Sequence, residues 1–175
     1  AISGELAELR AALDRAGVNP RSVTPLPEAY LKSYQPQAVW PSGATPEAAI
    51  AVARRIFDDA EVGGGMLSNF TELNRYRTAA AAGDFVTHGT TAIVHAADDV
   101  SVLQTLEALP QIFASVEALA PDKPYRLGLA SIGMRSNPYG SAVADNPDGR
   151  RIPMAMTDPR LDGLFGAAFL VGIVA

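Results

Sequence analysis

Apolar residues recur at helical spacing in several segments of the chain. The spacing predicts helices over residues 3–16, 45–58 and 99–119, a short helical turn over 77–83 and a final helix after Pro159. Pro110 interrupts the third of these segments and should kink or restart that helix, because proline lacks the backbone N–H. The final segment is apolar nearly all round, which indicates a helix that is largely buried.

Four short apolar runs alternate with these helices and are typical of strands. They cover residues 22–26, 66–70, 84–88 and 125–132, and residues 91–94 could extend the third. Gly63 to Gly65 stand before the second run, whereas a phosphate-binding glycine loop follows its strand and usually carries a lysine. We therefore interpret these glycines as a turn. The alternation of strands and helices predicts a parallel β/α architecture.

The loops that leave the predicted strands are long and carry nearly all of the His, Tyr, Arg and Asn residues, whereas those that enter strands are short. Sites form at the carboxyl ends of parallel strands, both in (β/α)8 barrels and in open sheets. The glycine-rich turn from strand to helix, which marks many open sheets, is missing. We therefore expect an α/β fold of the TIM-barrel-like (β/α)8 class. Residues 1–175 would form about half of the barrel units of a single catalytic domain.

Composition narrows the function further. The 175 residues are 48% hydrophobic with a net charge of -5. The sequence has no block of like charges, and this argues against a nucleic-acid-binding surface. The chain has no cysteine, which excludes thiol nucleophiles, thiolate metal sites and disulfides. The longest apolar run, residues 163–175, is about thirteen residues against roughly twenty for a bilayer, so no membrane partner is expected. The ends resemble those of a piece of a longer protein, and the expected location is the cytoplasm.

Reactive side chains gather directly after the second predicted strand. Glu72, Asn74 and Arg75 place a carboxylate, an amide and a guanidinium within four residues, and Glu72 is our candidate for the centre of a site. In the alternative interpretation, Thr71 caps a helical turn while Glu72 and Arg75 form a solvated pair three residues apart. The sequence leaves both interpretations open.

The other candidates follow other strands. The first long loop holds Tyr30, Lys32, Tyr34 and Trp40, which could stack on a sugar ring or could only pack the loop onto the domain. The end of the third strand and the loop after it carry His88, His95 and Asp98. Their spacing matches no tight metal-ligand motif, so no metal and no other cofactor is expected. A serine nucleophile is disfavoured, because the chain has no G-x-S-x-G elbow.

Four stretches resemble the D-apionate lactonase family. They are AYLKSYQP at residues 29–36, GGGMLSNFTELNR at 63–75, DFVTHGTTAIVHAADD at 84–99 and YRLGLASIGMRSNPYG at 125–140. The resemblance implies a (β/α)8 barrel related to glycoside hydrolases. It also implies hydrolysis of D-apionolactone to D-apionate, in the bacterial breakdown of a plant branched sugar. The chain would then be an internal part of the longer protein, whose remaining residues complete the barrel around a small sugar lactone.

Opening a lactone needs an activated water, a partner for the oxyanion and groups that hold the substrate hydroxyls. From residue chemistry, Glu72 is the candidate general base, His88 or His95 a competing base, and Arg75 or Arg135 the oxyanion partner. The substrate-binding candidates are Lys32, Tyr34, Asn74, His95, Asp98, Arg135 and Asn137. A glycoside hydrolase would need two carboxylates at one bond, and only Glu72 is so placed. A non-catalytic carbohydrate-binding domain is the third alternative.

Overall fold

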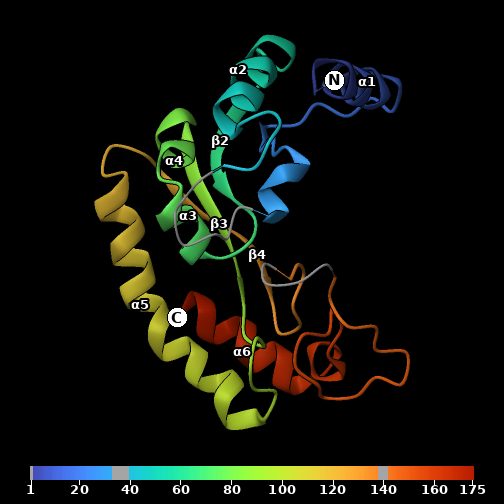
Figure 1. Ribbon diagram of the computed structural model, residues 1–175, viewed down its shortest axis with the longest axis vertical. Coiled ribbons are helices and arrows are strands. Elements are labelled where there is room, and N and C mark those ends of the chain that lie inside the picture. The colour runs from blue at the N-terminus through green and yellow to red at the C-terminus, as the bar shows by residue number, and fades with distance from the viewer. Residues whose placement is uncertain (1, 33–39, 138–141) are drawn as a thin grey trace.

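The structure is a computed structural model that describes residues 2–32, 40–137 and 142–175. Helices and strands alternate along it, as Figure 1 shows. In chain order the elements are α1 (Ile2–Arg15), β1 (Ser22–Val23), the 3-10 helix η1 (Glu28–Lys32), α2 (Pro46–Ile56), β2 (Glu61–Met66), α3 (Phe70–Arg75), α4 (Thr78–Ala82), β3 (Phe85–Thr91), α5 (Asp99–Leu119), β4 (Tyr125–Ser131), η2 (Pro159–Asp162) and α6 (Leu164–Val174).

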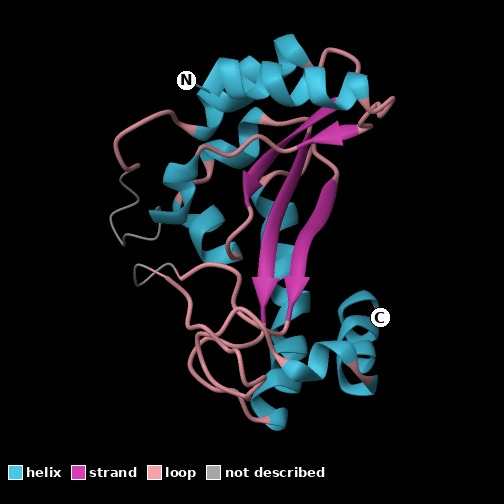
Figure 2. Cartoon of the chain, turned by 90° about the vertical axis from the view of Figure 1, so that its right-hand side faces the viewer, coloured by secondary structure: helices cyan, strands magenta, loops and turns pink. Residues whose placement is uncertain are grey.

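The four strands form one sheet in the order β1-β2-β3-β4, and every neighbouring pair is parallel. The register pairs Gly64 of β2 with Val86 of β3, and Val86 with Tyr125 of β4. Parallel neighbours need a crossover connection, which the helices between the strands supply. In Figure 2 the long strands run side by side and loops gather beyond their arrowheads. These loops therefore lie at the carboxyl ends of the strands.

Helices cover one face of the sheet through three apolar clusters, one of which packs α2 on β2. In the first cluster, Met66 and Val86 from the strands pack with Leu73 of α3, Ala80 of α4 and Val116 of α5. In the second cluster, helices α5 and α6 pack against the residues that follow β3 and β4, through Ile93, Val102, Leu109, Ile132, Phe169 and Ile173. Removing this apolar surface from water is the main stabilising contribution.

The opposite face of the sheet carries charge. Side chains alternate along a strand, so Phe85 lies on the face opposite to that of Val86. The Arg126 guanidinium lies 4.1 Å from the centre of the Phe85 ring. Its Nη2 atom reaches both carboxylate oxygens of Glu61, at 2.9 and 2.7 Å. This face would line the interior of a closed barrel.

The interpretation of Gly63 to Gly65 as a turn is wrong, because all three glycines lie within strand β2. Their small size is needed there for close packing. A Cβ atom built on Gly64 would overlap the carbonyl oxygen of Ala79, and one built on Gly65, whose φ is 153°, would overlap that of Thr87. The strand consequently ends at Met66, four residues earlier than predicted.

The predicted helices and the other three strands are present, and four details differ. Helix α5 runs without a break through Pro110, so the lost hydrogen bond does not end the helix. Strand β3 continues to Thr91, whereas β1 is only two residues long. The final helix is not largely buried, since Leu164 is 90% and Val174 83% exposed. An all-round apolar helix needs cover on every side, and among the described residues α6 has it on one side.

In the part of the chain that the structure describes, no helix combines the length and the apolar character that crossing a membrane requires.

Candidate active site

The chain turns sharply where β2 ends, and α3 begins after three intervening residues. Asn69 is the N-cap of α3, and its backbone N–H donates to Oε2 of Glu72 at 3.0 Å. This contact is one half of a capping box, in which the third helical residue reaches back to the cap. Glu72 is thereby held at the carboxyl end of β2.

Glu72 is a buried carboxylate, with only 2% of its surface exposed. Nη1 of Arg75 lies 3.7 Å from its Oε1, so the expected pair exists. The solvated pair of the alternative interpretation is nevertheless wrong, and the helix is capped by Asn69 instead of Thr71. Burial raises the pKa of Glu72, and hydrogen bonds from the backbone of α3 and the charge of Arg75 oppose this only in part. A raised carboxyl pKa is typical of acid and base catalysts.

A cavity of about 310 Å³ lies beside Glu72 and extends between the sheet and helices α3 and α5. A water molecule in the liquid occupies about 30 Å³, so the cavity can hold several. The wall combines Glu72 and His88 with four threonines and several apolar side chains, among them Phe70, Thr71, Thr90, Thr91, Thr105, Ile112 and Met134. The two predicted bases therefore share one cavity.

His88 is fully buried on β3, and both of its ring nitrogens have partners. Nδ1 lies 2.7 Å from the carbonyl oxygen of Gly89, which can only accept, so Nδ1 carries the proton. Nε2 is therefore the acceptor for the Tyr125 hydroxyl at 2.8 Å. The ring also stacks against that of Tyr125 and meets the edge of Phe70. Burial lowers the pKa of His88, so the ring stays neutral and its basic nitrogen is occupied.

A second, much smaller pocket, of about 10 Å³, opens at the carboxyl ends of β2, β3 and β4. Its wall is formed by Leu67, Ser68, Asn69, Thr90, Thr91, Leu129, Arg135 and Ser136. It shares Asn69, Thr90 and Thr91 with the larger cavity, so the two adjoin. Arg135 also lies near enough to Tyr30 for its charge to lower the pKa of that tyrosine, although burial raises the pKa overall. The segment after β1 that carries Tyr30 is therefore close to the same pocket. We call this pocket the mouth pocket.

The remaining predicted residues lie apart from these cavities or have local partners. Oδ1 of Asn74 accepts from Arg77 at 2.8 Å on the exposed side of α3. Asp98 caps α5, accepting from the backbone N–H of Ser101 at 2.9 Å and from its hydroxyl at 2.6 Å. Those bonds lower the pKa of Asp98. Nδ2 of Asn137 donates to the carbonyl oxygen of Ala142 at 2.9 Å.

For three predicted candidates the structure gives at most a position in the chain and no contact with either cavity. His95 is exposed in the loop before α5. Lys32 is the last residue of η1, and Tyr34 lies outside the described residues. Among the residues that are described, no group of three or more side chains is arranged to hold a metal ion, and His88, His95 and Asp98 do not converge on one.

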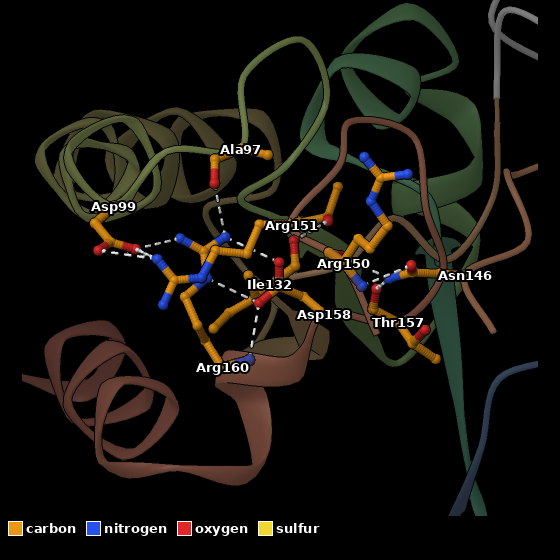
Figure 3. A network of polar contacts seen from close by, with 10 residues as sticks. Ala97, Asp99, Ile132, Asn146, Arg150, Arg151, Thr157, Asp158 and Arg160 are labelled. Carbon is orange, nitrogen blue, oxygen red and sulfur yellow. Dashed lines mark hydrogen bonds and ion pairs between the residues drawn. The ribbon is translucent and has the colours of Figure 1, made fainter. Parts of the chain in front are cut away.

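A buried arginine anchors the long loop that carries Arg135 and Asn137. Arg160 donates from Nε and Nη2 to the two carboxylate oxygens of Asp158, at 2.9 Å each. The same side chain reaches Asp99 of α5 at 2.6 Å and the carbonyl oxygen of Ala97 at 2.9 Å, as Figure 3 shows. Burial acts to raise the pKa of Asp158, but the bonds from Arg160 outweigh it and lower that pKa. The loop is therefore tied to the start of α5.

Asn146 organises the loop itself. Its Nδ2 atom donates to the carbonyl oxygens of Arg150 and Thr157, at 2.7 and 2.9 Å, and its Oδ1 accepts from the backbone N–H of Arg150 at 2.8 Å. These bonds, also drawn in Figure 3, close a turn that begins at Asn146.

The sequence analysis missed Ser68, Asn69 and Tyr125. The first two were placed inside a strand that ends before them, and the signal that would have moved them is the Asn-x-x-Glu spacing of a capping box. The third, Tyr125, was interpreted only as the start of a strand. Its contact with His88 depends on the register of β3 and β4, which no local pattern reveals.

We predict that Tyr125→Phe destabilises the complete protein by about 1–3 kcal/mol, because it leaves Nε2 of His88 buried without a donor. Tyr76→Phe is the matched control, since the Tyr76 hydroxyl lies 3.5 Å from the Glu47 carboxylate and its loss should change stability by less than about 0.5 kcal/mol. Denaturant unfolding of both variants measures the difference. Equal effects of the two changes would contradict the assignment.

Comparison with known proteins gives the family. All of residues 1–175 match the family model described as "D-apionate lactonase, TIM barrel domain". The chain is 53% identical over 154 residues to the D-apionate lactonase of Brucella anthropi. That match covers 88% of this chain and 25% of the relative, so the chain spans about a quarter of that protein's length. No solved structure matches. The expected barrel fold and the family resemblance are confirmed: the chain belongs to the D-apionate lactonase family and lies within its TIM barrel domain.

Proposed function

We propose that the complete protein hydrolyses a sugar-derived lactone, converting D-apionolactone to D-apionate, and that residues 1–175 form part of its catalytic barrel domain. Membership in the family carries this proposal. The buried carboxylate of Glu72, which follows the carboxyl end of β2 and lines a cavity, supports it chemically. The ligand would be a small sugar lactone in a bacterial pathway of carbohydrate breakdown. The rest of the barrel would complete the site, and a cytoplasmic location is part of the proposal.

In the proposed reaction Glu72 acts as the general base. A water in the cavity attacks the carbonyl carbon of the lactone while its proton passes to the Glu72 carboxylate. The electron pair of the carbonyl bond moves onto oxygen, and the Arg135 guanidinium stabilises that oxyanion. When the tetrahedral intermediate collapses, the bond from the carbonyl carbon to the ring oxygen breaks. The proton held by Glu72 passes to the ring oxygen, which leaves as a hydroxyl.

The contacts favour some of the competing candidates over others. Glu72 is preferred to His88 because Nε2 of His88 is occupied by the Tyr125 hydroxyl. Arg135 is preferred to Arg75 as the oxyanion partner because it lines the mouth pocket. Arg75 lies beside Glu72 instead, and its charge lowers the pKa of that carboxylate. A general base with a pKa nearer to neutrality transfers protons more effectively, which suits a buried carboxylate.

The substrate-binding roles rest on position. Arg135, Asn137 and Lys32 follow strands in the chain, and we keep them, together with Tyr34 from the sequence analysis, as the groups that bind the sugar hydroxyls. His95 stays a prediction. The contacts of Asn74 and Asp98 are local, and these two residues have no part in the proposed mechanism.

We predict that Glu72→Gln in the complete protein abolishes turnover and leaves D-apionate binding within about tenfold, because glutamine keeps the shape and loses the base. Glutamine also serves in a capping box, so α3 should stay formed. Glu72→Ala is the comparison, since it removes the bond to the Asn69 backbone as well. Steady-state kinetics and calorimetric titration test this, and near wild-type turnover of Glu72→Gln would remove Glu72 from the mechanism.

The pH dependence of stability provides a check on folding. Because burial raises the pKa of Glu72 in the folded state, the folded protein holds this proton more tightly than the unfolded chain does. Wild-type stability is therefore lost as pH rises through that pKa. Glu72→Gln lacks this loss, so its melting temperature should equal or exceed that of wild type at neutral pH. A clearly lower value would mean that the carboxylate is a structural requirement.

The reaction class can be tested with one panel of substrates. Acid release from sugar-derived γ-lactones is followed beside sugar release from chromogenic glycosides, with and without a chelator. We expect the complete protein to open D-apionolactone and related lactones, with no effect of the chelator and no glycoside cleavage. Glycoside cleavage without lactone opening would instead support the glycoside hydrolase alternative. Binding without turnover of either class would support a carbohydrate-binding domain.

A further inference from the structure

One buried hydroxyl has no hydrogen-bond partner among the described residues. Ser68 is 7% exposed, and its Oγ atom bonds to no protein group. It lies near enough to the Glu72 carboxylate to lower the pKa of that group slightly, although burial dominates and the contact has no hydrogen-bond geometry. Buried polar side chains are nearly always paired, so an unpaired one is a cost that folding alone does not explain.

The position of Ser68 accounts for this cost. Ser68 follows the end of β2 and lines the mouth pocket together with Thr90 and Arg135. Gly89 of β3 lies directly against it, since a Cβ built there would overlap the carbonyl oxygen of Ser68. The close approach of the two strands fixes the Ser68 backbone at the carboxyl edge of the sheet, where (β/α) enzymes bind substrate. The Ser68 backbone is therefore held in place beside a pocket that carries a positive charge, and its Oγ atom is itself buried.

We propose that the Ser68 hydroxyl binds the substrate, donating a hydrogen bond to the lactone carbonyl oxygen alongside the Arg135 guanidinium. This inference rests on the proposed lactonase function and adds a second donor to the oxyanion site. Negative charge builds up on that oxygen as water attacks, so the hydrogen bond is stronger in the transition state than in the ground state. A donor whose partner is the substrate is unpaired in the protein alone.

Substitution of Ser68 separates this role from a structural one. In the complete protein, Ser68→Ala should lower kcat for D-apionolactone by roughly 10–100-fold, with a smaller change in KM, because one oxyanion donor is lost. Its melting temperature should equal or exceed that of wild type, since an unpaired buried polar group is removed. Ser115→Ala is the control: Ser115 lies on the exposed side of α5, where its hydroxyl bonds to the Gln111 carbonyl oxygen, and its loss should leave kcat unchanged.

Three outcomes would overturn the inference. Wild-type kcat in Ser68→Ala would show that the hydroxyl does not contact the reacting oxygen, while the lactonase proposal would stand. A fall in activity together with a fall in melting temperature would make Ser68 a structural residue. A wild-type protein that opens no lactone at all would overturn the proposed function and this inference with it.

Discussion

The close approach of β2 to its neighbours is the constraint on which the site depends. Gly64 lies against the backbone of α4, and Gly65 against that of Thr87 on β3. No other residue could occupy these positions without moving the strand away from the sheet. The strand ends at Met66, and the next residues turn over the carboxyl edge. The glycines thus position Ser68 and Glu72 without taking part in the chemistry themselves.

Glu72 combines two demands that usually conflict. Its carboxylate completes the capping box of α3, which stabilises the start of a short helix. The same burial that allows this contact raises its pKa and makes its charge costly. Arg75 offsets part of that cost at 3.7 Å. A carboxylate that is buried, partly compensated and beside a cavity is suited to accept a proton from an attacking water.

Sequence patterns predicted the architecture well, because they depend on local rules. Helical spacing located α1, α2 and α5, and the alternation of strands with helices predicted the parallel sheet. The patterns failed where tertiary packing decides: the glycines of β2 satisfy a contact with α4, and Pro110 is tolerated inside α5. The site was predicted in part. Glu72 was found from its position after a strand. The contact between Tyr125 and His88 depends on strand register, which the sequence does not give. Ser68 was missed because the predicted strand extended past the true end of β2.

Helix α6 exposes an apolar side that no described residue covers. Leu164, Val171 and Val174 are all more than half exposed, and such an apolar surface requires a neighbour. In a (β/α)8 barrel each helix packs between adjacent units, and the relative from Brucella anthropi is about four times as long as the matched region. The remaining barrel units would cover this face and enclose the site.

The most direct test is a crystal structure of the complete protein with bound D-apionate. We expect the product carboxylate at the carboxyl ends of β2, β3 and β4, within hydrogen-bonding distance of Ser68 Oγ and the Arg135 guanidinium, with Glu72 facing it across the cavity. Product bound only among the strands beyond residue 175, with Ser68 and Glu72 in no contact with it, would contradict the proposed site.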